Sequence, residues 1–241
     1  AGAPERALAS CDAGLRARPG HAGLLAAQSL ALAACGRADE ARGLADPERF
    51  VHALPLDPAL AAAVAAEVEA HPSVRQAALR HATRDGYHSS DLSPQPGSAL
   101  ARLRDEASRA AERHAAGLPR GGRHPFVAAR PRRTALSLWG VVLPEGGHQV
   151  PHVHPDAWLS AVFYARVPAV VRPDDPDRAG WLSFGEVPAE LPPVELPCRA
   201  VAPRPGLLVL FPAHLYHHTV IFRGPERRIS VAFDFVPIAD P

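Results

Sequence analysis

The chain has no lysine, no methionine and little cysteine. All 26 basic residues are arginine, which excludes reactions that need a lysine, such as Schiff-base chemistry or phosphate binding by a Gly-Lys loop. The three cysteines, Cys11, Cys35 and Cys198, are too few and too scattered for a disulfide framework or a thiolate metal site. They predict a reducing compartment, the cytoplasm. Because no methionine opens the sequence, we expect the chain to be a piece of a longer protein.

The sequence also lacks long apolar runs and a strong net charge. No apolar run reaches membrane-spanning length and no signal peptide opens the chain, so we expect no membrane partner. The formal net charge is +1, which gives no global field to recruit nucleic acid. What the chain does have is length and apolar content. Its 241 residues, 47% of them hydrophobic, can bury one full core.

The first part of the chain is alanine-rich and helical. Apolar residues recur at helical spacing over 4–44, with breaks at Pro19-Gly20 and Gly36. This pattern, with GRADEA after the second break, resembles a tetratricopeptide repeat entered halfway. A plain helical hairpin packed on the main domain is the other interpretation. We predict a partial tetratricopeptide-like segment over 1–46, open to a protein partner, and a main domain over 47–241.

Two more helices precede the strands. Asp57-Pro58 supplies an N-cap and a first-turn proline for a helix that runs to about Ala70. Ser98 can cap an amphipathic helix that ends near Gly117. The segment between them, 73–97, is polar and rich in Gly and Pro, which predicts a loop.

From about residue 124 to 237 the sequence has the character of strands. Short β-branched or aromatic runs alternate with Pro and Gly turns: TALSLWGVVL (134–143), AWLSAVFYARV, WLSFGEV, LLVLF, HHTVIF and RRISVAFDFV. Regular strands over about a hundred residues indicate a sandwich or a double-sheet jelly roll. The predicted fold class is therefore α+β, with a β core flanked by helices.

Histidines at the edges of two of these runs predict a metal site. His152 and His154 are two residues apart, so on a strand both side chains point to one face and can reach one metal ion. His217 and His218 are adjacent, so only one of them can join; we choose His217 because its strand face is the more polar. Three ligands with open positions suit non-haem Fe(II) oxygen chemistry. Asp156 is the alternative third ligand, provided that the chain turns sharply after His154.

Arg228 predicts an anionic cosubstrate beside this metal. A guanidinium pairs with a carboxylate in a bidentate fork. Ser230 shares the face of Arg228 on the predicted strand. Tyr164 and Ser160, at the ends of another alternating run, can add hydroxyl donors to the same pocket.

Four stretches carry a resemblance to a known family: GHQVPHVHPDAWLSAVFY, GWLSFG, RPGLLVLFPAHLYHHTV and ERRISVAFDF. In this order they resemble the 2-oxoglutarate- and Fe(II)-dependent oxygenases that often carry tetratricopeptide repeats ahead of the catalytic domain. The resemblance implies a double-stranded β-helix core. It places the metal on His152, His154 and His217, the 2-oxoglutarate anchor on Arg228 with Ser230 beside it, and a hydroxyl donor on Tyr164.

The resemblance also implies a reaction. Fe(II), 2-oxoglutarate and O2 would take part in an oxidative decarboxylation coupled to hydroxylation of a substrate, either a protein or peptide or a small molecule. Two other functions fit parts of the sequence: a jelly-roll adaptor without activity, which holds a metal or none, and a three-histidine, cupin-like dioxygenase without a cosubstrate. Neither alternative needs Arg228 and Ser230 on the face of the histidines.

Overall fold

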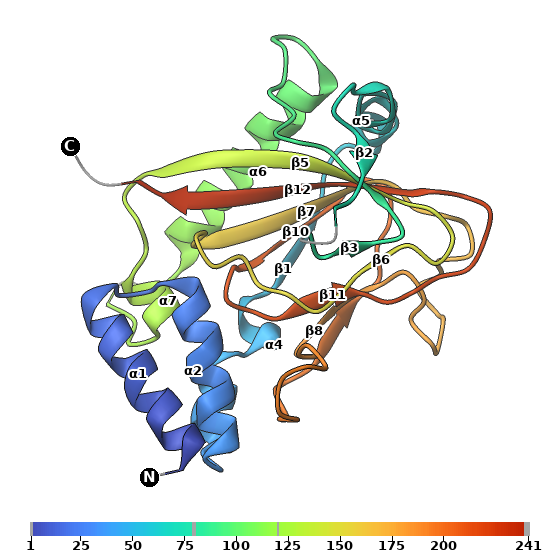
Figure 1. Cartoon of the computed structure of the whole chain (residues 1–241). Helices are drawn as coiled ribbons and strands as arrows, with labels where there is room; N and C mark the ends of the chain where they lie inside the picture. Colours follow the sequence, from blue (N-terminus) through green and yellow to red (C-terminus); the bar gives the residue numbers. More distant parts are fainter. Residues whose placement is uncertain (1, 79–80, 120, 239–241) are drawn as a thin grey trace.

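The computed structural model describes residues 2–78, 81–119 and 121–238. It begins with three helices, α1 (Ala3–Ala17), α2 (Ala22–Ala34) and α3 (Ala38–Leu44), shown in blue in Figure 1. Gly20 and Gly36 stand at the two breaks with φ of 76° and 73°, a conformation that glycine adopts without a steric cost. The predicted helices and breaks are confirmed. Their assignment to a tetratricopeptide repeat stays a prediction.

The middle of the chain contains helices and short strands. These elements are α4 (Pro47–Phe50), β1 (His52–Pro55), α5 (Pro58–Ala70), β2 (Arg75–Gln76), β3 (Thr83–Arg84), β4 (Tyr87–His88), α6 (Ala99–Gly117) and α7 (Pro125–Ala128). Both predicted N-caps are present: Asp57 accepts from the backbone N–H of Ala59, and Ser98 from that of Ala101. The loop predicted over 73–97 was wrong where β2, β3 and β4 form. Strands of two residues are too short to show an alternating pattern.

The remaining strands, apart from β6, belong to the two sheets of the core. They are β5 (Thr134–Leu143), β6 (His148–Gln149), β7 (Leu159–Arg166), β8 (Leu182–Phe184), β9 (Arg199–Val201), β10 (Leu207–Pro212), β11 (His217–Thr219) and β12 (Arg228–Pro237). Within the described ranges, a large antiparallel sheet has the order β1-β10-β7-β12-β5-β4-β2, and a small sheet has the order β11-β8-β9. The strands β3 and β6 pair separately. The predicted double-sheet jelly roll is confirmed.

The large sheet extends beyond the core expected over 124–237. Strand β1 pairs with β10, and β4 with β5, although β1 and β4 come before α6 in the chain. The four residues of β1 read His-Ala-Leu-Pro, which is too short and too mixed to predict a strand. It forms because the edge of β10 offers unpaired backbone groups.

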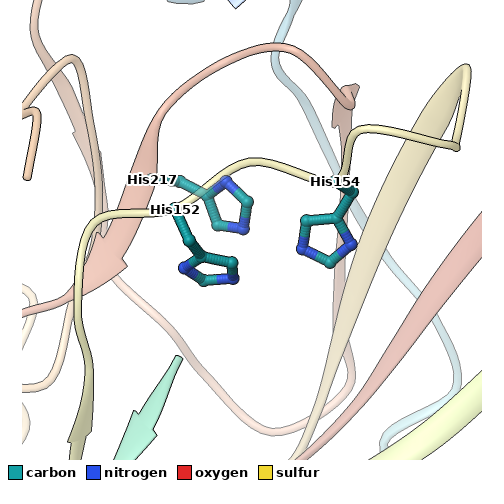
Figure 2. Close-up of side chains that lie close together, drawn as sticks. All are labelled: His152, His154 and His217. Carbon is teal, nitrogen blue, oxygen red and sulfur yellow. The ribbon is translucent and has the colours of Figure 1, made fainter. Parts of the chain in front are cut away.

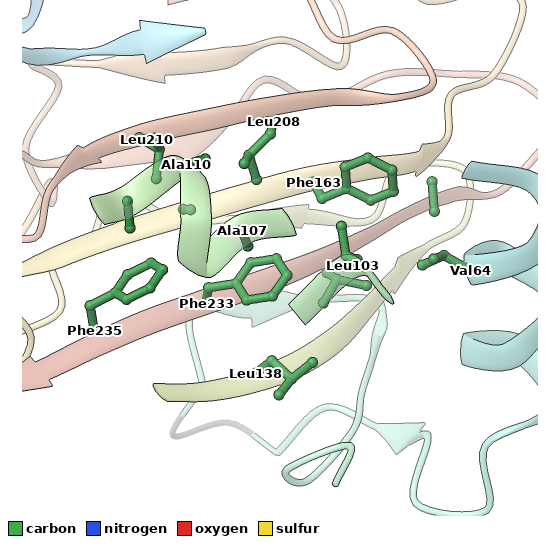
Figure 3. Packing of buried hydrophobic residues seen from close by; sticks show 14 of the residues in the cluster. Val64, Leu103, Ala107, Ala110, Leu138, Phe163, Leu208, Leu210, Phe233 and Phe235 are labelled. Carbon is green, nitrogen blue, oxygen red and sulfur yellow. The ribbon is translucent and has the colours of Figure 1, made fainter. Parts of the chain in front are cut away.

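One face of the large sheet packs against helices α5 and α6. Figure 3 shows Leu103, Ala107 and Ala110 of α6 over Phe163 of β7 and Phe233 of β12, all in one apolar cluster. On β12 the odd-numbered residues from 229 to 235 belong to this cluster. Since side chains alternate along a strand, the even-numbered residues face the other way, toward the small sheet.

The two sheets enclose a second, smaller apolar cluster. Phe184 of β8 packs edge-on against Phe211 of β10, with ring centroids 5.1 Å apart. Tyr164 of β7 belongs to the same cluster and is fully buried. These side chains fill part of the space between the two sheets.

The half-buried His124 and the buried His214 connect the N-terminal helices to the core. The Nε2 atoms of His124 and His214 lie 3.1 and 3.0 Å from the carbonyl oxygen of Leu44, the last residue of α3. A helix leaves its last carbonyls without intrahelical partners, and these rings satisfy one of them.

Among the described residues, no helix is long and apolar enough to cross a membrane.

Candidate metal centre and cosubstrate pocket

The three predicted histidines meet where the segment 152–154 runs beside β11. His152 and His217 exchange backbone hydrogen bonds, with N–O distances of 3.1 and 3.0 Å, and the N–H of His154 donates to Ala213 at 3.0 Å. The main chain thus sets the spacing of the two segments. One ring nitrogen from each of the three histidines lies within 4.8 Å of the other two. Figure 2 shows the three rings converging from these segments.

Hydrogen bonds on the far side of each ring fix its tautomer. Nδ1 of His152 lies 2.8 Å from the carbonyl oxygen of Val150, and Nδ1 of His217 lies 2.9 Å from that of Leu215. A carbonyl oxygen only accepts, so each Nδ1 carries the proton and donates. Each Nε2 then keeps its lone pair, which is the form that binds a metal ion.

Burial keeps two of these rings neutral. Desolvation, with the neighbouring His154 as a second cause, lowers the pKa of His152 to about 4. Desolvation, together with His152 and His154, also lowers the pKa of His217 well below its usual value. Neutral imidazoles at pH 7 are ready to bind a cation without first losing a proton.

The guanidinium of Arg228 is buried in a cavity beside the histidines. Its lining comes from both sheets: Trp139, Val141, Gln149, His154, Ala161, Val162, Tyr164, Leu182, Phe211, His217, Arg228, Ser230 and Ala232. Arg228 is only 1% exposed, and its guanidinium carbon lies 4.8 Å from the centroid of the Tyr164 ring. Ser230 and Tyr164 are direct partners across β12 and β7.

The polar atoms of this cavity fit an anionic ligand such as a carboxylate. Within the described ranges, Nε and Nη1 of Arg228 and the hydroxyl of Tyr164 are buried and have no hydrogen-bond partner. Burial lowers the pKa of Arg228 and raises that of Tyr164, as expected for polar groups kept from water. Buried donors rarely lack a hydrogen-bond partner, and one carboxylate can accept hydrogen bonds from all three atoms.

The predicted residues Asp156 and Ser160 do not line this cavity, and neither do the adjacent residues His218 and Arg227. Asp156 is exposed in a turn and is not brought into the histidine cluster. The hydroxyl of Ser160 donates to Asp234 at 2.6 Å. His218 lies 3.6 Å from Glu186, on the face of β11 opposite His217. Arg227 is exposed, with its guanidinium carbon 5.8 Å from the ring centroid of Tyr87.

Two residues near the histidines were missed by the sequence analysis. Asp234 accepts a hydrogen bond from Nδ1 of His154, at 2.7 and 2.9 Å from its two oxygens. Trp139 stacks on His154 with ring centroids 5.7 Å apart. The alternation Arg228, Ser230, Ala232, Asp234 along one strand was the signal for Asp234. No comparable signal marked Trp139 within its apolar run.

Part of the chain matches the model of a known family. Residues 137–234 match the family model described as "Putative 2OG-Fe(II) oxygenase". The matched stretch contains the three histidines and Arg228. A comparison with curated proteins found no match.

Solved structures share the fold at low sequence identity. A prolyl-4-hydroxylase from Pseudomonas putida is 16% identical, with a TM-score of 0.56 over 82% of this chain and 98% of that chain. HygX from Streptomyces hygroscopicus, solved with nickel and 2-oxoglutarate bound, is 14% identical, with a TM-score of 0.54 over 79% and 84%. A Trichoplax adhaerens prolyl hydroxylase in complex with a peptide fragment is 10% identical, with a TM-score of 0.51 over 84% and 92%. The solved structures therefore share the fold of this chain, and residues 137–234 are similar to the family described as putative 2OG-Fe(II) oxygenases.

Proposed function

We propose that His152, His154 and His217 hold the Fe(II) of this enzyme, and that Arg228 holds 2-oxoglutarate by its far carboxylate. When bound, the metal and cosubstrates supply an oxidative decarboxylation of 2-oxoglutarate coupled to hydroxylation of a substrate C–H bond. The protein's share is to bind, orient and exclude water. The three rings offer bare Nε2 atoms at one point and leave other positions of the metal open.

Arg228 and its neighbours orient the cosubstrate. A guanidinium stays protonated at neutral pH and presents donors in a planar fork that matches a carboxylate. The Tyr164 hydroxyl can donate to the same carboxylate. Ser230 is opposite Tyr164 in the sheet, and its hydroxyl is a second possible donor. The apolar walls from Leu182 and Phe211 keep water from this end of the cavity.

One observation carries the proposal: a buried arginine with unpaired donors lines the same cavity as His154 and His217. Leaving a charge in such a place is costly unless a counter-ion completes it. A metal-binding adaptor or a three-histidine dioxygenase without a cosubstrate would have no use for this cation. The arginine therefore favours 2-oxoglutarate chemistry over both alternatives.

An anaerobic titration tests the proposal. Metal-free protein is titrated with Fe(II) and then with 2-oxoglutarate, and the visible charge-transfer band of an iron-bound keto acid is recorded. The proposal expects the band in the wild type. Iron binding without a band would favour the three-histidine dioxygenase, and no iron binding would favour the adaptor.

The substrate is proposed to be a protein or peptide, with a small molecule as the alternative. Solved structures of this fold include both kinds: the Trichoplax enzyme is bound to a peptide fragment, and HygX was also solved with hygromycin B bound. Helices α1–α3 add a surface beside the core, and a protein partner for them stays a prediction from the sequence. Succinate release measured against a peptide library and a small-molecule library will separate the two classes.

A further inference from the structure

His154 differs from the other two histidines in the partner of its remote nitrogen. Nδ1 of His152 and Nδ1 of His217 face backbone carbonyls, which are neutral acceptors. Nδ1 of His154 faces the carboxylate of Asp234, at 2.7 and 2.9 Å from its two oxygens. One ring of the three is thus bonded to a group that carries a full negative charge when ionised.

Asp234 is held in this direction from a second side. Ser160 stands directly opposite Asp234 in the sheet, and its hydroxyl donates to Oδ1 at 2.6 Å. The side chains of His154 and Asp234 are 12% and 17% exposed. A carboxylate so far removed from water needs fixed donors, and these two donors supply them.

The hydrogen bond between His154 and Asp234 bears on the charge that the ligands bring to the metal ion. Two histidines and one carboxylate form the usual facial set for non-haem Fe(II), and that carboxylate brings one negative charge to the ion. Three neutral imidazoles bring none. A carboxylate bonded to the remote nitrogen of a ligating imidazole raises the basicity of the ligand and fixes its orientation.

We propose that Asp234 is a positioning residue for the metal centre. Through His154 it keeps Nε2 bare and aimed at the ion, and it supplies from behind the ring the negative charge that a carboxylate ligand would bring directly. This inference rests on the proposed function, since it assumes that the three histidines hold Fe(II).

The test uses Asp234→Asn, which keeps an oxygen acceptor of the same size and removes the charge. Affinity is measured by anaerobic titration with Fe(II) alone, and the energy of the charge-transfer band is then recorded with 2-oxoglutarate. The inference expects Asp234→Asn to weaken Fe(II) binding about 10- to 100-fold. It also expects the band to move to higher energy, because a less electron-rich iron gives up its electron less readily.

A matched variant separates this role from a structural one. Asp156→Asn removes an exposed carboxylate that is two residues from His154 in the chain and outside the histidine cluster. It is expected to bind Fe(II) within about threefold of the wild type and to leave the band in place. An unmoved band and unchanged affinity in Asp234→Asn would overturn the inference. If the wild type binds no Fe(II), the proposed function fails first and this inference fails with it.

A measurement on the wild type covers the case in which Asp234→Asn does not fold. In the Zn(II)-loaded protein, nuclear magnetic resonance detects the Nδ1 protons of the bound histidines. A proton shared with a carboxylate has a stronger hydrogen bond than one given to a carbonyl. The His154 proton is therefore expected furthest downfield, and a His154 proton level with those of His152 and His217 would refute the inference.

Discussion

Arg228 and Asp234 lie on the same face of β12, at the two ends of the candidate site. Arg228 lines the cavity beside Tyr164, and Asp234 is hydrogen-bonded to His154. Ser230 and Ala232 fill the face between them and line the cavity. A single strand thus places a buried guanidinium at one end of the candidate site and a hydrogen-bonded carboxylate at the other.

Arg228→Met should stabilise the cosubstrate-free protein and abolish its response to 2-oxoglutarate. Methionine fills a similar volume and removes a buried charge whose Nε and Nη1 atoms lack partners, for a gain of about 1–4 kcal/mol. In contrast, 2-oxoglutarate at about 100 times its Kd stabilises a protein that binds it by about 2.7 kcal/mol. Thermal unfolding of the metal-loaded protein, with and without 2-oxoglutarate, measures both effects.

Arg227→Met is the matched control for this experiment. Arg227 is the neighbouring residue on the exposed side of the chain, so its replacement should leave the 2-oxoglutarate shift intact. A variant at Arg228 that keeps the full shift would move the cosubstrate anchor to another residue.

His217→Ala should abolish metal-dependent turnover of 2-oxoglutarate, whereas His218→Ala should retain most of it. The two residues are adjacent on β11, but only His217 joins the cluster with His152 and His154. The paired variants differ by one position and lose the same atoms, so general damage to the strand would affect both. Succinate formation measures turnover, and equal losses in the two variants would reject the ligand assignment.

The metal-free protein should lose stability as the pH falls from about 6.5 toward 4. Burial lowers the pKa of His152 and of His214 from 6.5 to about 4, so the unfolded chain binds more protons than the folded one in this window. Their contribution is complete above pH 6.5 and declines below it. At about 1.4 kcal/mol per pH unit and group, each loses about 2 kcal/mol by pH 5.

Urea unfolding between pH 5 and 7 measures this slope. His214→Gln, which does not touch the metal site, should reduce the slope by the share of one histidine. An unchanged slope in this variant would show that His214 is not held neutral by the fold.

Leu103→Ala should lower the free energy of unfolding by about 2–5 kcal/mol. Leu103 is fully buried where α6 covers the large sheet, and its removal leaves a cavity. Arg104→Ala, on the exposed side of the same helix, should cost less than about 0.5 kcal/mol. Urea denaturation compares the two, and similar losses would mean that α6 does not pack as described.

The parts of the fold that were predictable are those with a repeating pattern. The run from Thr134 to Leu143 was expected as a strand, and β5 has the same bounds. The caps at Asp57 and Ser98 mark helices because their side chains bond the first free N–H groups. In each case the signal lies within a few residues of the element that it predicts.

The parts that were not predictable depend on distant partners. Strand β1 exists because β10, more than 150 residues later, pairs with it. The role of Asp234 appears only once the fold brings it to His154, 80 residues earlier in the chain. Alternation shows which face of the strand Asp234 occupies, but it does not show that His154 lies beside that face.

The function of each position on β12 depends on whether its number is even or odd. Even-numbered positions from 228 to 234 face the candidate site, and odd-numbered positions from 229 to 235 make the apolar contacts to the helices. Substitutions at even and odd positions should therefore produce different failures, of binding and of folding. A one-residue deletion at the start of the strand would exchange the two sets and cause both failures at once.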